Sequence, residues 1–231
     1  MILVTVCIVS LPCIGMQGPV NNDTASIAKM NNKNIRIFID TFSSCINSKT
    51  LLPCGWLADR HDATTFSLLK EQGNYFVKIK TLGGTAAIGK SVVIDFAGAP
   101  FLSWRWRVHA LPVGGNESVK KKNDSGAGVY VFFPGPLLLK KIVKYVWSTT
   151  LPQGAMLTSP YYINFKIVVL RSGNDSLGKW ITEKVNVLDD YMKFFGSPPE
   201  KALGIAILSD GDNTNSSAEA DYDDFVVSNC K

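Results

Sequence analysis

Short runs rich in Val, Ile, Phe, Tyr and Trp recur along the chain from residue 35 onward, and they limit its fold more than any other feature. Gly, Pro, Asn and Ser fill the gaps between the runs, and several runs alternate polar with apolar residues. This pattern predicts an all-β fold, a sandwich or a barrel. The predicted strands are IRIFID, TFSLLK, YFVKIKTL, SVVIDF, FLSWRWRV, GVYVFF, KYVWST, INFKIVVLR, KWITEKVNV, GIAILS and YDDFVVS.

One short helix is predicted inside this β pattern, near residues 187–195. Its apolar residues recur at helical spacing, and they are Leu188, Tyr191, Met192 and Phe195. Asp189 and Asp190 suit the first turn, Gly196 suits the C-terminal cap, and Pro198 cannot continue the helix. No internal repeat or composition break divides the body, so residues 35–231 are expected to form one domain.

The first 22 residues carry no charge, and their apolar run MILVTVCIVSLPCIGM has the length of a signal-peptide core. The run is too short to span a bilayer comfortably. We predict a signal peptide over residues 1–17, a flexible polar linker over residues 18–34, and an exported protein, periplasmic or extracellular, with no transmembrane span in the mature chain. Lipid attachment at Cys13 is a second option.

Three cysteines remain without the leader, Cys45, Cys54 and Cys230. In an oxidising compartment this odd number predicts one disulfide and one spare thiol. Cys45 with Cys54 is the favoured pair, because it closes a short loop and would stabilise the fold by about 2 to 3 kcal/mol. Cys230 is the alternative partner, because sandwich folds often place their first and last strands side by side.

Several function classes have little support in the sequence. The string GTAAIGKS, Gly84 to Ser91, matches a phosphate loop, but that motif needs a helix starting at its Lys. Lys90 instead opens a β-like run, so we interpret the string as a hairpin connector and expect no nucleotide. The two histidines, His61 and His109, stand in no hydrolase motif. A net charge of +5 is too small and too scattered to predict nucleic-acid binding.

Trp104 and Trp106 alternate with Arg105 and Arg107, so a strand sends the two pairs to opposite faces. With the tryptophans in the core, which is the commoner arrangement, the arginines become ligand contacts and Arg171 joins them from another strand. Their planar forks would favour an acidic glycan. Alternatively, exposed tryptophans form an aromatic shelf for sugars, or the arginines pair with neighbouring acids and only support the sheet.

Oxygen ligands are densest in the acidic segment SDGDNTNSSAEADYDDF. Carboxylate and amide oxygens are ligands that calcium prefers, although the spacing is not that of an EF-hand. We predict a structural calcium that clamps the chain ends, and a solvated loop is the alternative. The expected ligands are Asp40, Asp210, Asp212, Asn213, Glu219 and Asp224.

Five segments, in order, resemble the bacterial exported family called domain of unknown function 3047. They are LSWRWRVHALPVG, YVWSTTLPQGAMLTSPY, IVVLRSG, GKWITEKVNVLDDYMKFFGSPP and GIAILSDGDNTNSSAEADYDDF. The resemblance brings no catalytic residues, because the family is uncharacterised. The chain departs from the family before its VYV strand, where only Asp124 remains of a group of acids and an Arg.

The strand order and the closing ADYDDFVV are also similar to jelly-roll modules of the galactose-binding type. That similarity implies a jelly-roll β-sandwich, a carbohydrate ligand and a structural calcium. Function is therefore expected to be binding of a glycan or another cell-envelope component. The alternatives are a glycan-cleaving enzyme that works with two carboxylates and a structural partner in an envelope complex.

Overall fold

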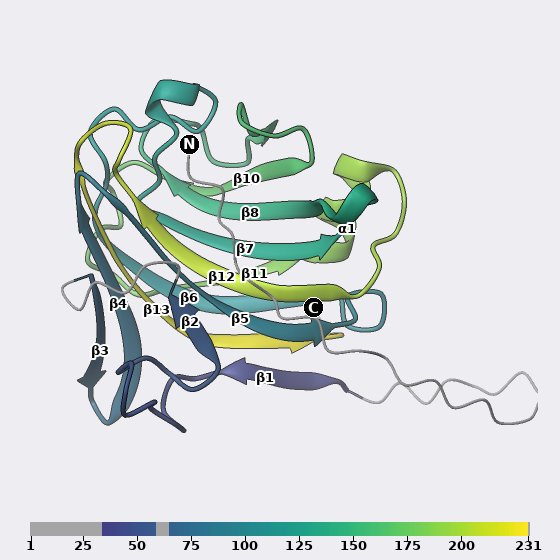
Figure 1. Ribbon diagram of the computed structural model, residues 1–231, viewed down its shortest axis with the longest axis horizontal. Coiled ribbons are helices and arrows are strands. Elements are labelled where there is room, and N and C mark those ends of the chain that lie inside the picture. The colour runs from purple at the N-terminus through teal and green to yellow at the C-terminus, as the bar shows by residue number, and fades with distance from the viewer. Residues whose placement is uncertain (1–33, 59–64, 231) are drawn as a thin grey trace, which may run out of the picture.

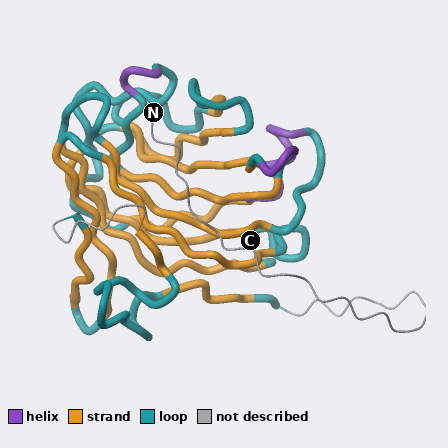
Figure 2. Tube along the Cα trace, viewed as in Figure 1, coloured by secondary structure: helices purple, strands orange, loops and turns teal. Residues whose placement is uncertain are grey.

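The computed structural model describes residues 34–58 and 65–230 (Figure 1). The predicted signal peptide, nearly all of the predicted linker, and His61 lie outside these ranges. Strands account for most of the described chain, and loops join them at both ends of the sheets (Figure 2).

One sheet holds six strands in the order β11-β6-β13-β4-β3, with β1 paired to the end of β13. Their bounds are β1 Arg36–Asp40, β3 Phe66–Glu71, β4 Asn74–Leu82, β6 Phe101–Ala110, β11 Ile181–Asn186 and β13 Ser217–Ser228. All of these neighbours are antiparallel.

The second sheet holds seven strands in the order β2-β5-β12-β7-β8-β10-β9. Their bounds are β2 Trp56–Ala58, β5 Thr85–Ile94, β7 Ala127–Pro134, β8 Lys140–Ser148, β9 Met156–Thr158, β10 Phe165–Ser172 and β12 Ala202–Asp210. Figure 1 shows β5, β12, β7, β8 and β10 lying side by side. Only the pair β10 and β8 runs parallel.

The core lies between the two sheets, because alternate side chains of each strand point inward. Trp104 and Trp106 of β6 are fully buried. Their rings lie 5.7 Å from Tyr145 and 6.0 Å from Trp147, which come from β8 of the other sheet. The fold is therefore the predicted β-sandwich, and the tryptophans lie on the predicted core side.

The predicted helix is present as α1, Val187–Phe195. The Asn186 side chain accepts a hydrogen bond from the Asp189 N–H, and Gly196 caps the other end with a φ of 74°. Two three-residue 3-10 helices, Lys120–Lys122 and Pro136–Leu138, lie in loops.

The hairpin-connector interpretation of GTAAIGKS was wrong. Residues 85–91 of that string lie within β5, and the strand continues through Lys90 to Ile94. Antiparallel pairing with β12 covers this stretch, with Ile205 opposite Lys90. Sequence periodicity missed the strand because small residues, Ala86, Ala87 and Gly89, interrupt its β-like composition.

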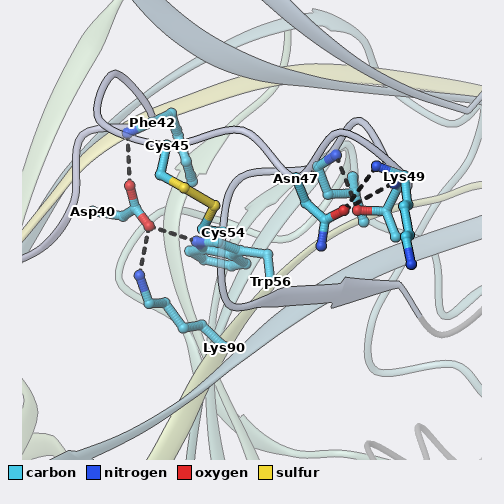
Figure 3. Close-up of a disulfide and its surroundings, with 10 residues drawn as sticks. Asp40, Phe42, Cys45, Asn47, Lys49, Cys54, Trp56 and Lys90 are labelled. Atoms are coloured by element: carbon cyan, nitrogen blue, oxygen red, sulfur yellow. Dashed lines mark hydrogen bonds and ion pairs between the residues drawn. A yellow bond between two sulfur atoms is a disulfide. The ribbon is translucent and has the colours of Figure 1, made fainter.

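The first and last strands lie side by side, since Ile37 of β1 pairs with Val227 of β13. The disulfide joins Cys45 to Cys54 as predicted, with 5.4 Å between their Cα atoms (Figure 3). Phe42, three residues before this closed loop, is buried in the core, where its ring lies 5.3 Å from that of Trp56. Cys230 keeps a free, exposed thiol.

Candidate functional site

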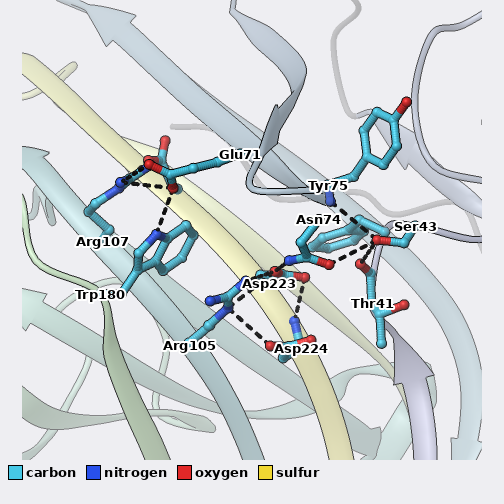
Figure 4. Close-up of polar contacts among 12 residues, drawn as sticks. Thr41, Ser43, Glu71, Asn74, Tyr75, Arg105, Arg107, Trp180, Asp223 and Asp224 are labelled. Atoms are coloured by element: carbon cyan, nitrogen blue, oxygen red, sulfur yellow. Dashed lines mark hydrogen bonds and ion pairs between the residues drawn. The ribbon is translucent and has the colours of Figure 1, made fainter.

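Arg105 and Arg107 lie together on the outward face of the six-stranded sheet (Figure 4). Arg105 donates through Nε to Asp223 Oδ2 at 3.1 Å, and its Nε also lies 3.0 Å from Asp224 Oδ2. Arg107 donates through Nε to Asp221 Oδ2 at 2.7 Å, and its Nη1 lies 3.2 Å from Glu71 Oε2. Both guanidinium groups are thus paired with carboxylates, as the sheet-support alternative expected.

Asp221 collects three basic groups although it is fully buried. Besides Arg107, His109 Nε2 lies 2.7 Å from its Oδ2, and Lys78 Nζ lies 3.4 Å from its Oδ1. The neighbouring Asp223 is buried as well, and burial raises its pKa above the usual value despite the hydrogen bond from Arg105. Strand β13 therefore presents a row of desolvated carboxylates to the bases of β4 and β6.

Trp180 is the central site residue that sequence reasoning missed, and its neighbours Glu71 and Phe76 were missed with it. Its indole centroid lies 4.5 Å from the Arg105 Cζ and 4.6 Å from the Arg107 Cζ, within cation–π range. Its Nε1 donates to Glu71 Oε2 at 3.2 Å, and its ring meets Phe76 edge-on at 5.5 Å. Hydrogen bonds from Trp180 and Arg107 hold the pKa of Glu71 below its usual value.

Trp180 stays partly exposed, so these contacts fix the indole without removing it from solvent. Its place follows from the pairing of β11 with β6, which sets Ile181 opposite Trp106. We call this group, Glu71, Phe76, Arg105, Arg107 and Trp180, the Trp180 cluster. One sequence feature pointed to Trp180, its position at the start of a predicted strand. The sequence did not show that this strand pairs with β6, which brings Trp180 to Arg105 and Arg107.

Arg171 does not join Arg105 and Arg107. Its Nε donates to Glu183 Oε1 at 2.7 Å, and the same carboxylate accepts from Trp106 Nε1 at 3.2 Å. Glu183 lies opposite Trp104 in the pairing of β11 with β6, on the inward side of that sheet. Arg171 therefore ties β10 of one sheet to β11 of the other, away from the Trp180 cluster.

Trp104 and Trp106 cannot form the alternative aromatic shelf, because both are 0% exposed. Their aromatic partners come from inside the sandwich, including Phe225 stacked at 6.4 Å on Trp104. Among the predicted ligand-binding residues, only Arg105 and Arg107 reach the outward face.

Three of the predicted calcium ligands, Asp40, Glu219 and Asp224, are each paired with a basic side chain. Asp40 already accepts from Trp56 Nε1 at 2.9 Å and from Lys90 Nζ at 2.6 Å (Figure 3). Asp224 pairs with Arg105, and Glu219 pairs with Lys78 and Lys80. A carboxylate neutralised by an ammonium group has little affinity left for a cation.

Asp210 and Asp212 instead meet Asp124, with one carboxylate oxygen from each within 4.8 Å of the others. Asp124 is buried and accepts from Asn213 N at 3.2 Å and from Thr214 N at 2.7 Å. Asn213 thus contributes a backbone N–H at this place. Burial raises the pKa of Asp210 to about 7, against the opposing effect of Lys144, and the other two carboxylates add to the rise.

The raised pKa of Asp210 predicts a stability that depends on pH. The unfolded chain releases this proton near pH ~3.9, whereas the folded protein keeps it up to about pH 7. In buffer with a chelator, stability contributed by this group is therefore full below pH ~4, declines as pH rises to 7, and stays low above it. We expect Asp210→Asn to melt above the wild type at pH 8, and the difference to shrink at pH 5. An equal difference at both pH values would contradict this assignment.

Residues 56–226 match the family described as "Protein of unknown function (DUF3047)". The match covers well over half of the chain. The protein belongs to the DUF3047 family. Its matched range holds the whole Trp180 cluster and the carboxylates of β13 that pair with it. No curated protein matches this DUF3047 chain.

Solved structures with a similar arrangement have low TM-scores. The carbohydrate-binding module TmCBM61, in complex with β-1,4-galactotriose, shares 12% identity at a TM-score of 0.35, over 75% of this chain and 88% of its own. CBM27-1 of Caldicellulosiruptor saccharolyticus, in complex with mannohexaose, shares 11% at 0.39, over 84% and 96%. A cellulase derived from Cel12A of Rhodothermus marinus shares 9% at 0.40, over 84% and 99%. Such identities are too low to transfer a ligand.

Proposed function

We propose that this DUF3047 protein binds a neutral glycan on the outward face of its six-stranded sheet, at the Trp180 cluster. The observation that carries the proposal is a partly exposed indole in contact with two guanidinium groups that are themselves ion-paired. An immobilised aromatic ring loses little further freedom on binding, so it makes an efficient contact.

The chemistry of the face fits a sugar. A sugar ring offers an apolar C–H face to an aromatic side chain, while its hydroxyl groups both donate and accept hydrogen bonds. Arg105 with Asp223, and Arg107 with Asp221, set planar donors beside acceptors on either side of Trp180. Neighbouring hydroxyl groups of one sugar can accept a hydrogen bond from a guanidinium group and donate one to a carboxylate.

The charge balance favours a neutral glycan over the acidic one that the arginines alone indicated. The basic side chains Lys78, Lys80, Arg105 and Arg107 face five carboxylates, from Glu71, Glu219, Asp221, Asp223 and Asp224. An acidic ligand would have to displace carboxylates already bonded to the guanidinium groups and would be repelled by the rest.

Structural support alone is a weak reason for these ion pairs. Taking Asp221 and Asp223 out of water costs several kcal/mol each, and apolar residues of similar size often give equal stability. A sheet that needed only covering would be served by apolar side chains. The presence of charged side chains on this sheet, where apolar ones would cover it equally well, supports the proposal that the surface recognises a polar ligand.

We also propose that the protein works outside the cytoplasm. The Cys45–Cys54 disulfide fits an oxidising compartment. None of the described helices has the length and apolar character needed to cross a membrane. The proposal covers both the periplasm and the extracellular space, and it keeps lipid attachment at Cys13 as the second option.

Affinity electrophoresis against a panel of neutral and acidic polysaccharides tests the glycan proposal. We expect retardation by a neutral polysaccharide, and Trp180→Ala should weaken it at least about tenfold, or ~1.4 kcal/mol. Tyr161→Ala is the matched control, because Tyr161 is an exposed aromatic residue outside the six-stranded sheet. Absence of binding, or binding that Trp180→Ala leaves unchanged, would overturn the proposal. Release of reducing ends would favour the glycan-cleaving alternative.

The calcium expected from the sequence remains a proposal, now at Asp124, Asp210 and Asp212. A cation there would relieve the mutual repulsion of the three carboxylates. Binding to the folded state alone raises the melting temperature by mass action. We expect millimolar calcium to raise it at pH 8, a chelator to reverse the rise, and Asp212→Asn to abolish it. Asp224→Asn, at a ligand position of the chain-end clamp expected from the sequence, should leave the rise intact.

A further inference from the structure

The sandwich is open along one side, between β1 and β5. Strand β5 pairs with β2 from Ile88 to Lys90 and no further, so residues 91–94 have no strand on that side among the described residues. The outer edge of β1 is unpaired there as well. A cavity of about 220 Å³ lies between these edges, and it is lined mainly by Ile35, Ile37, Val92, Val93, Ile94 and Val227.

Apolar side chains at the rim of this cavity are unusually exposed. Ile37 is 53% exposed, Phe38 59% and Val93 73%. We call these three residues with Ile35 the open-edge patch. A contiguous exposed apolar patch marks an interaction surface more often than a scattered single residue does.

The free thiol lies at the same edge. Cys230 is exposed, and its Sγ lies 3.2 Å from Asn34 Oδ1, one residue before Ile35. The preceding Asn229 donates its N–H to the Ile35 carbonyl oxygen at 3.2 Å. The thiol and the open-edge patch are therefore neighbours on one surface.

An exposed thiol is out of place in a chain that holds a disulfide. The other two cysteines of the described residues are already bonded to each other. In the oxidising compartment that the Cys45–Cys54 bond fits, an accessible unpaired cysteine is available for an intermolecular disulfide. A second copy of the chain brings an identical thiol beside an identical apolar patch, as a two-fold contact requires.

We propose that two copies of this protein meet at the open-edge patch and are joined by a disulfide between their Cys230 residues. The two thiols lose two protons and two electrons, and the Sγ–Sγ bond forms. The two protons and two electrons pass to the disulfide of a thiol–disulfide oxidoreductase, which is reduced to a dithiol.

The patch and the bond depend on each other. Four side chains bury far less than the ~800 Å² per partner of a stable interface, so apolar contact alone would not hold the dimer. The disulfide makes the contact intramolecular and raises its effective concentration to the millimolar range, about 10⁻³ M. The patch in turn orients two thiols that would otherwise meet at random.

The full chain, oxidised in a glutathione redox buffer and analysed by non-reducing electrophoresis and mass spectrometry, tests the proposal. We expect a dimer that a reductant dissolves and Cys230→Ser abolishes. Val93→Asp should slow dimer formation at least about tenfold with the thiol intact, while Val113→Asp, at an equally exposed valine elsewhere, should not. Melting curves confirm that the variants fold.

Three results would overturn the proposal. Cys230 could stay fully alkylatable after oxidation. Peptide mapping could find it bonded to Cys7, Cys13 or glutathione. The Val93→Asp variant could dimerise at the wild-type rate, which would leave random oxidation of a surface thiol as the explanation.

Discussion

Replacing Trp104 by Ala should lower the free energy of unfolding by about 3 to 5 kcal/mol, much of the 5 to 15 kcal/mol typical of a domain. Trp104 is fully buried and packs against Trp106, Tyr145 and Phe225 from both sheets. Neither sheet can close over the space, because the neighbouring rings are held by their own strands. Its buried Nε1 has no hydrogen-bond partner among the described residues, so the expected loss is one of packing.

Denaturant unfolding of matched variants measures this effect. Trp104→Phe keeps most of the ring volume and drops the unpaired N–H, so it should cost clearly less than Trp104→Ala. Trp180→Ala removes the same side chain from a partly exposed position on the opposite side of the sheet and should cost least. A midpoint for Trp104→Ala within experimental error of Trp180→Ala would contradict the assignment of the core face.

The alternation in SWRWR was enough to predict which face is core, because a strand has only two sides. The hydrophobic preference of Trp then chose between them. The ion pairs of Arg105 and Arg107 were not predictable in the same way. Their carboxylates come from β13 and β3, more than 100 residues later and more than 30 residues earlier, and strand pairing decides which acids lie opposite.

Which of the predicted calcium ligands lie together depends on the register of β13, and sequence alone does not determine that register. The segment around Glu219 was expected to be a loop, but β13 begins at Ser217 and turns Glu219 toward the lysines of β4. A clamp on the chain ends requires Asp40 near Asp224, and β1 does pair with this end of β13, where Asp40 lies opposite Phe225. The Asp40 carboxylate is nevertheless occupied, because Lys90 from the other sheet donates a hydrogen bond to it.

Replacing Asp221 by Ala is the second change with a large expected effect, about 2 to 3 kcal/mol of unfolding free energy. Removing one partner of a fully buried ion pair costs ~3 to 5 kcal/mol. The estimate here is lower because Arg107, Lys78 and His109 are 15%, 22% and 29% exposed, so water compensates part of their lost contacts. Repulsion between Arg107 and Lys78, once Asp221 is gone, adds to the cost.

The same variant should also abolish glycan binding, because Arg107 is held against Trp180 by Asp221 on one side and Glu71 on the other. Asp221→Asn separates the two effects. It keeps the shape and one oxygen acceptor but not the charge, so it should recover part of the stability and little of the binding. Glu200→Ala, which removes an exposed carboxylate outside this sheet, is the control for both readouts. If Asp221→Asn binds like the wild type, packing alone positions Trp180 and the ion pairs serve only the sheet.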